Sequence, residues 1–157
     1  MKAEHIQLRA AQVQDVEAMY QLMLPLMQDK TLIQRDKDDL YQHVQEFVVA
    51  IVDEQLLGVA ALHVYASNLA EIRSLVVAPH AQGWGLGLLL VQNCEDFARQ
   101  VGVSTVFALT YVDTFFIKQG YRVVSKESLP QKVWTVCIHC PKFSFCDEIA
   151  VQKDLVS

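Results

Sequence analysis

A glycine-rich turn, placed between an apolar run and a helical pattern, is the stretch of this sequence best suited to chemistry. Residues 75–77 (Leu-Val-Val) form the apolar run, and residues 82–87 (Gln-Gly-Trp-Gly-Leu-Gly) form the turn. A helix that begins after such a turn presents free backbone N–H groups and the positive end of its dipole to an anion. Glycine suits the turn because a Cβ would block the close approach of a phosphate and disfavour positive φ. The arrangement predicts a pyrophosphate-binding site.

The spacing of the glycines distinguishes three classes of phosphate-binding turn. A P-loop needs a Lys after its last glycine, and no Lys lies near these residues. A Rossmann fingerprint would need glycine where Leu88 stands and an acid at the end of the next strand, Thr105–Thr110, which has none. The remaining pattern, Gln/Arg-x-x-Gly-x-Gly/Ala, is met by Gln82, Gly85 and Gly87. It resembles the acetyl-CoA pyrophosphate loop of the GNAT superfamily of N-acetyltransferases.

Hydrophobic periodicity predicts the elements that hold this turn in place. Apolar runs and alternation predict strands at residues 6–9, 47–52, 56–65, 70–77, 105–110, 121–124 and 148–153. Apolar residues three and four apart predict helices at about 15–27, 37–46, 86–101 and 114–119. Pro25 should kink the first helix or end it early, and the charged segment 28–39 is expected to be a surface loop. The order resembles the GNAT fold, an α/β (α+β) fold whose mixed central sheet splays open after the fourth strand and is flanked by helices.

Length and composition limit the classes of protein to which the chain can belong. A length of 157 residues predicts one domain, 1–157, with a cysteine-containing tail segment at 130–157. The formal net charge of −5 argues against nucleic acid as a partner. No apolar run approaches the roughly 20 residues of a membrane span, and the first residues lack the pattern of a signal peptide. Cysteines without an export signal favour a reducing, cytoplasmic location.

The resemblance to GNAT enzymes implies how acetyl-CoA is bound. In that fold the pantetheine arm hydrogen-bonds to the exposed edge of the splayed strand, as an added strand would. The resemblance assigns these backbone contacts to the apolar run, the pyrophosphate to the glycine-rich turn, and packing against pantetheine to a downstream phenylalanine. The implied cofactor-binding residues are Leu75, Val76, Val77, Gln82, Gly83, Trp84, Gly85, Leu86, Gly87 and Phe116.

Glu71 is the candidate general base. It lies on the strand before the turn, and simple alternation would place it on one face with Arg73, Leu75 and Val77. Acetyl transfer to an amine requires that the ammonium group lose a proton. A partly desolvated carboxylate at this position can take that proton, directly or through a water.

The general acid is less well defined by the sequence. Many GNAT enzymes place a Tyr four residues before the glycine of a Tyr-x-x-x-Gly-Phe/Tyr segment, and here Phe116 stands at that position. A phenylalanine cannot donate a proton to the departing thiolate. Tyr111, a water, or a thiolate that leaves unassisted remain as alternatives.

Further segments resemble a narrower group within the superfamily, the N-acetylglutamate synthases. They are the segment ending in Leu32-x-x-Arg35, the strand AEIRSLVV, and a cysteine-bearing tail like that of the short, single-domain bacterial members. The resemblance implies acetyl transfer from acetyl-CoA to the α-amine of L-glutamate, the first step of arginine biosynthesis, by direct attack in a ternary complex. Because glutamate carries two carboxylates, its site needs cationic donors, and Arg35, Arg73 and Lys142 are the candidates. A homodimer is compatible with this interpretation.

Two other functions stay open. The same fold and chemistry can serve another amine, such as glutamine, another amino acid or a protein N-terminus. The missing Tyr at Phe116 also allows a non-catalytic, acyl-CoA-binding regulatory module.

The tail contains a cluster of thiols whose role the sequence leaves open. Cys137, Cys140 and Cys146, with His139 between them, have the residue types of a zinc site. The spacing matches no familiar zinc knuckle, and a Cys137–Cys140 redox pair lacks the usual strand-then-helix setting. Packing of partly buried thiols is the favoured interpretation, so no metal is expected.

Overall fold

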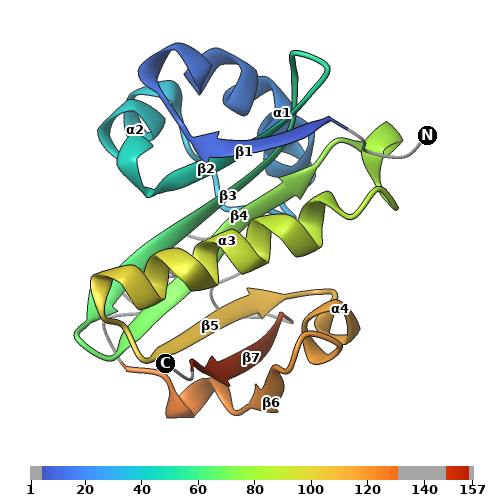
Figure 1. Cartoon of the computed structure of the whole chain (residues 1–157). Coiled ribbons are helices and arrows are strands. Elements are labelled where there is room, and N and C mark those ends of the chain that lie inside the picture. The colour runs from blue at the N-terminus through green and yellow to red at the C-terminus, as the bar shows by residue number, and fades with distance from the viewer. Residues whose placement is uncertain (1–4, 131–147, 156–157) are drawn as a thin grey trace.

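The computed structural model describes residues 5–130 and 148–155, and a seven-stranded sheet forms the centre of this part of the chain. Its strand order is β1-β2-β3-β4-β5-β7-β6 (Figure 1). Neighbouring strands are antiparallel except β4 and β5, which run parallel, so the expected mixed sheet is confirmed. The strands are β1 (Ile6–Ala10), β2 (Phe47–Val52), β3 (Gln55–Ala66), β4 (Leu69–Val77), β5 (Thr105–Thr110), β6 (Arg122–Val124) and β7 (Ile149–Asp154).

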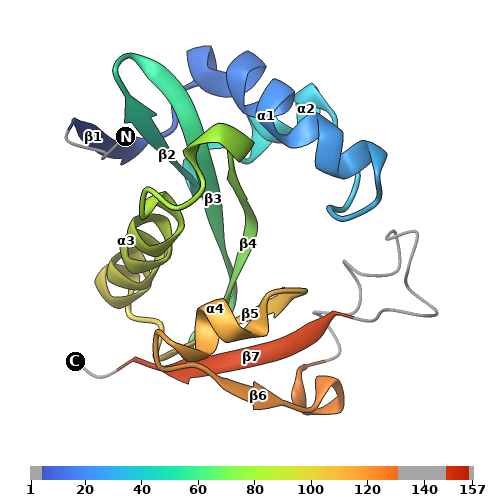
Figure 2. The ribbon, with the colours of Figure 1, turned by 90° about the vertical axis from the view of Figure 1, so that its right-hand side faces the viewer.

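Helices cover both faces of this sheet. Figure 2 shows α1 and α2 on one face and α3 on the other, with the short α4 beside the C-terminal strands. In the described residues, none of the helices has the length and apolarity needed to cross a membrane. The bounds are α1 (Val16–Gln28), α2 (Lys37–Gln42), α3 (Leu86–Val101) and α4 (Asp113–Ile117).

The boundaries of the first two helices differ from those expected. α1 contains Pro25 and still continues to Gln28, so the early end was wrong. The missing proline N–H leaves only the carbonyl of Gln21 without its helical partner, and Gln21 is exposed to water. The second helix ends at Gln42, where His43 leaves helical geometry, and a short 3-10 turn (Val44–Glu46) follows.

The sheet opens between β4 and β5. The two strands pair only at Ala70 with Val106 and at Glu71 with Phe107, and then diverge (Figure 2). This is the splay expected after the fourth strand. Beyond Glu71 the edge of β4 is therefore available to a ligand.

A β-bulge interrupts β4 just after the splay begins. Ser74 adopts a positive φ of 56°, and the register with β3 shifts by one residue between Arg73 and Val76. Because a shift of one residue exchanges the two faces of a strand, the side chains beyond the bulge turn over. Leu75 and Val77 pack toward α3, whereas Val76 packs toward α1. The expectation that Glu71 and Arg73 share a face with Leu75 and Val77 is therefore wrong.

A buried ionic cluster joins α3 to the C-terminal strands. Tyr121 donates a hydrogen bond of 2.7 Å to Glu95 Oε2, and burial raises the pKa of this phenol. Lys153 Nζ lies 3.3 Å from both oxygens of Glu95 and donates to the carbonyl of Gln119 at 2.9 Å. The cluster fixes the helix that begins at the glycine-rich turn to the part of the sheet beyond the splay.

Replacing Glu95 with glutamine is expected to lower the free energy of unfolding by about 3 kcal/mol, because it leaves a largely buried ammonium group without its counter-charge. Chemical denaturation measures this loss. The matched control is Arg122→Gln on neighbouring β6. It removes an exposed ion pair in which Arg122 Nη1 lies 3.6 Å from Asp154 Oδ2, and it should lower the free energy of unfolding by less than about 1 kcal/mol. Equal losses in the two variants would contradict a structural role for the cluster.

Candidate active site

The glycine-rich turn has the geometry of an anion cradle. Gly83 and Gly85 adopt φ values of 89° and 87°, and a Cβ built on either meets no heavy atom within 4 Å. Gly85 is the N-cap of α3, and the first helical bond runs from the Leu89 N–H to the Gly85 carbonyl at 3.2 Å. The N–H groups of Leu86, Gly87 and Leu88, which precede this bond, are those that a helix leaves free at its start. Gly85, Leu86, Gly87 and Leu88 all lie at an opening beside the turn.

This opening is part of a cavity of about 570 Å³ between the turn, the edge of β4 and α4. Its walls combine apolar side chains with the backbone of the glycine-rich turn. The lining residues are Leu75, Val77, Ala81, Gln82, Gly83, Gly85, Leu86, Gly87, Leu88, Val112 and Phe115. We call it the coenzyme cavity.

A second cavity, of about 170 Å³, opens where β4 and β5 diverge. Its walls come from the α1–α2 connection, the β4 bulge, the end of β5 and the residue before β7. The lining residues are Thr31, Leu32, Ile72, Arg73, Ser74, Leu75, Ala108, Leu109, Thr110, Tyr111, Val112, Phe116 and Glu148. We call it the acceptor cavity. It shares Leu75 and Val112 with the coenzyme cavity, so ligands in the two cavities would meet at the bulge.

Three of the expected cofactor residues lie elsewhere than on the coenzyme cavity. Val76 is buried toward α1 and lines neither cavity. Trp84 packs on the core with its ring centroid 6.0 Å from that of His80. Phe116 is buried and lines the acceptor cavity, while its neighbour Phe115 lines the coenzyme cavity.

Glu71 lies at the last position where β4 pairs with β5, on the same face of β4 as Arg73, and directly precedes Ile72 of the acceptor-cavity wall. It is only 8% exposed and accepts a hydrogen bond of 2.9 Å from the hydroxyl of Tyr65. Burial raises the pKa of the Glu71 carboxyl, although Arg73, Tyr65 and His63 act in the opposite direction. A carboxylate with a raised pKa is a better base toward an ammonium group. Sequence reasoning missed Tyr65, because no motif marks it.

Arg35 is buried, although residues 28–39 otherwise form the largely exposed segment that was expected. It is 7% exposed, its Nε donates to Asp39, and its Nη1 donates to Ser74 Oγ at 3.3 Å. The guanidinium also lies over the Phe47 ring, 5.1 Å from its centroid. Because Asp39 compensates its charge, the arginine can connect the α1–α2 connection to the β4 bulge from a buried position.

The remaining candidates fall into two groups. Tyr111 and Arg73 line the acceptor cavity, with Glu148 as an acidic neighbour that the sequence did not single out. Lys142 and the cluster Cys137, Cys140 and Cys146 lie outside the described residues. Within residues 5–130 and 148–155 no group of three or more His, Cys, Asp or Glu is placed to hold a metal ion.

Comparison with known proteins agrees with this geometry. The model of the acetyltransferase (GNAT) family matches residues 14–121. An uncharacterised N-acetyltransferase of Chlorobaculum tepidum is 36% identical over 155 residues, which cover 99% of this chain and all of that protein. The amino-acid acetyltransferase of Mycobacterium tuberculosis is 33% identical over 80% of this chain and 74% of its own length.

Among solved structures, the N-acetylglutamate synthase of Neisseria gonorrhoeae, complexed with coenzyme A and N-acetyl-glutamate, is similar with a TM-score of 0.89 and 28% identity. The match covers 99% of this chain and 36% of that one, so the chain spans about a third of that enzyme's length.

The chain belongs to the GNAT family of acetyltransferases. It is an N-acetyltransferase that uses acetyl-CoA as the acetyl donor, as the glycine-rich turn predicted, and the GNAT fold is confirmed.

Proposed function

We propose that this enzyme transfers the acetyl group of acetyl-CoA to the α-amine of L-glutamate, the first step of arginine biosynthesis. The acceptor cavity carries the proposal, since it joins the coenzyme cavity at the β4 bulge and is lined by Arg73 and by Ser74, to which the buried Arg35 donates a hydrogen bond. The buried carboxylate of Glu71 lies two residues before Arg73 in β4. A small amine with two carboxylates matches these groups in size and charge. The likeness to an enzyme crystallised with N-acetyl-glutamate supports the same acceptor.

Each part of the reaction has a proposed residue. Glu71 takes the proton of the ammonium group, and its raised pKa suits it to that task. Arg35, attached to the bulge through Ser74, binds one carboxylate, and Lys142 is a further cationic candidate. Tyr111, on the wall of the acceptor cavity, protonates the departing thiolate. The coenzyme is held by the β4 edge and the glycine-rich turn, with Phe115 beside the pantetheine.

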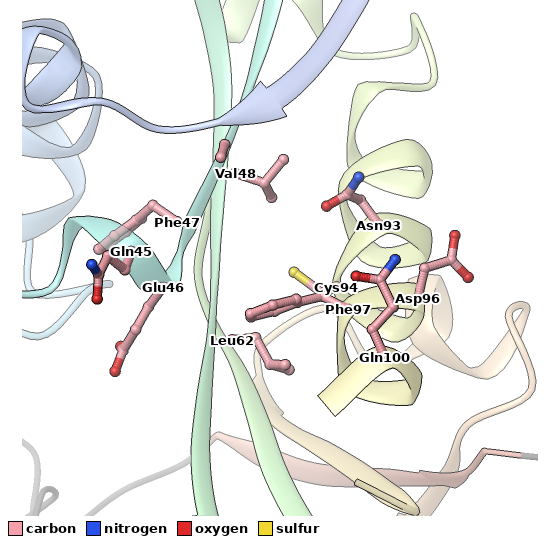
Figure 3. Close-up of a pocket in the computed structure, with 11 residues that line it drawn as sticks. Gln45, Glu46, Phe47, Val48, Leu62, Asn93, Cys94, Asp96, Phe97 and Gln100 are labelled. Carbon is pink, nitrogen blue, oxygen red and sulfur yellow. The ribbon is translucent and has the colours of Figure 1, made fainter. Parts of the chain in front are cut away.

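Direct attack of the amine on the thioester is the proposed route. A covalent acetyl-enzyme would need an activated nucleophile beside the coenzyme. Cys94 is buried on α3, and burial raises the pKa of its thiol to about 12, so it is an inert thiol. It lines neither the coenzyme nor the acceptor cavity but a separate cavity of about 260 Å³ between α3 and the sheet (Figure 3).

The experiment that tests the proposal measures release of free CoA from acetyl-CoA with each of the twenty amino acids in turn. The expected result is turnover with glutamate that exceeds every other amino acid in kcat/KM. Turnover with a different amino acid alone would change the proposed acceptor but leave the proposed acetyl transfer unchanged. Binding of acetyl-CoA without turnover on amino acids, polyamines or peptide N-termini would instead indicate a non-catalytic module.

A further inference from the structure

We propose that Arg73, held in place by Glu46, which His63 in turn hydrogen-bonds, binds a carboxylate of the acceptor and thereby selects acidic acceptors. The proposal deepens the proposed function, on which it rests for the location of the acceptor. Three observations carry it: the position of Arg73, the hydrogen-bond state of His63, and the unused donors of the guanidinium.

Arg73 connects the acceptor cavity to a polar cluster on the α1 face of the sheet. It lines the cavity, and its side chain is 17% exposed. Glu46 is the residue before β2, and its Oε1 lies 3.5 Å from Arg73 Nη2. Glu46 is also one of the residues that line the α3 cavity, but Figure 3 shows its side chain extending away from Cys94 and Phe97 of α3, and its carboxylate oxygens lie beside His63 and Arg73.

The Glu46 carboxylate is the group that both other members of the cluster, His63 and Arg73, approach. Burial alone would raise its pKa, but the hydrogen bond from His63 and the charges of His63 and Arg73 outweigh burial and lower it. Glu46 is therefore ionised at neutral pH. The charged carboxylate lies 3.5 Å from Arg73 Nη2 and restrains the guanidinium beside the acceptor cavity.

The position of the proton on the His63 ring determines what Arg73 can bond to. His63 Nδ1 lies 2.9 Å from Glu46 Oε2 and 3.3 Å from Arg73 Nη2. One ring nitrogen cannot donate to the carboxylate and accept from the guanidinium at the same time. The shorter contact, to an anion, requires a proton on Nδ1. His63 Nδ1 therefore donates a hydrogen bond to Glu46 and cannot accept one from Arg73.

Arg73 is consequently left with unused hydrogen-bond donors. Its Nε is buried without a partner, and Glu46 Oε1 also makes no hydrogen bond, so the 3.5 Å approach between the two side chains is an ion pair only. A guanidinium has five N–H donors arranged for bidentate binding of a carboxylate. A guanidinium with this capacity on the wall of the acceptor cavity fits an acidic substrate better than a neutral one.

The test compares kcat and KM for glutamate and glutamine in the wild type and in Arg73→Gln, with acetyl-CoA saturating. We expect the KM for glutamate to rise at least tenfold in Arg73→Gln while kcat stays within threefold. If the KM for glutamine is unchanged, Arg73 binds the side-chain carboxylate; if it rises equally, Arg73 binds the α-carboxylate. The KM for glutamate should rise less in Arg73→Lys than in Arg73→Gln, because lysine keeps the positive charge but lacks the bidentate geometry of arginine.

Two further variants separate binding from folding. Glu46→Gln should raise the KM for glutamate severalfold without changing the affinity for acetyl-CoA, because it removes only the positioning of Arg73. Arg99→Gln, which removes an arginine paired with Asp96 on the outer face of α3, is the matched control and should leave KM unchanged. Thermal unfolding of all variants shows whether they fold.

The outcomes also separate this inference from the proposed function. A wild-type enzyme that acetylates a different carboxylate-bearing amine would overturn the choice of glutamate, and the same comparison would then be made on that amine. An unchanged KM in a folded Arg73→Gln variant, a loss confined to kcat, or a preferred acceptor without a carboxylate would overturn the inference.

Discussion

Replacing Gly85 with alanine is expected to raise the KM for acetyl-CoA at least tenfold. Gly85 has a φ of 87° and lies on the coenzyme cavity at the N-terminus of α3. A Cβ at this position would project into the space that the pyrophosphate is expected to fill. Steady-state kinetics with acetyl-CoA as the varied substrate, and calorimetric titration with CoA, both measure the effect.

The chain provides a matched control at the other end of the same helix. Gly102 is the C-cap of α3, with a φ of 92° and, like Gly85, no heavy atom within 4 Å of an added Cβ. Alanine at either position carries a similar backbone strain of about 1–2 kcal/mol, so the two variants should lose similar stability. Only Gly85→Ala should lose affinity for the coenzyme. The same KM in both variants would contradict the phosphate-binding role of the turn.

Replacing Glu71 with glutamine is expected to lower kcat by about 10²–10⁴-fold, the usual contribution of a general base. The amide oxygen of glutamine can still accept the hydrogen bond from Tyr65, so the fold and the KM for acetyl-CoA should change little. Stopped-time assays of CoA release at saturating substrates measure the loss. Glu17→Gln, a change in an exposed carboxylate on α1, is the control.

The pH dependence provides the second readout for Glu71. The carboxyl must be unprotonated to act as a base, and burial raises its pKa above its ordinary value of 4.5. The rate should therefore fall as the pH drops through this raised pKa, and that acidic limb should be missing in Glu71→Gln. A kcat within threefold of the wild type, or a limb that persists in the variant, would assign the proton transfer to another group.

Local patterns were enough to predict most of the fold and the coenzyme turn. The glycine spacing and the apolar run before it are properties of a short segment, so their structure follows from neighbouring residues. The same holds for β2 and β5, whose bounds were predicted as Phe47–Val52 and Thr105–Thr110.

The acceptor side depends on residues far apart in the chain, which local patterns do not reveal. Ser74 is not a glycine, so nothing in the strand predicts its positive φ or the exchange of faces that follows. Arg35 looks like a surface charge until Asp39, Ser74 and Phe47 surround it. Tyr65 meets Glu71 only through the register of β3 and β4.

The most direct test of the proposed function is a competition between acceptors. The protein is incubated with acetyl-CoA and an equimolar mixture of the twenty amino acids, and the acetylated products are identified by mass spectrometry. N-acetylglutamate is expected to be the dominant product, with CoA released in equal amount. Consumption of acetyl-CoA with a different dominant product, or with no acetylated amino acid at all, would contradict it.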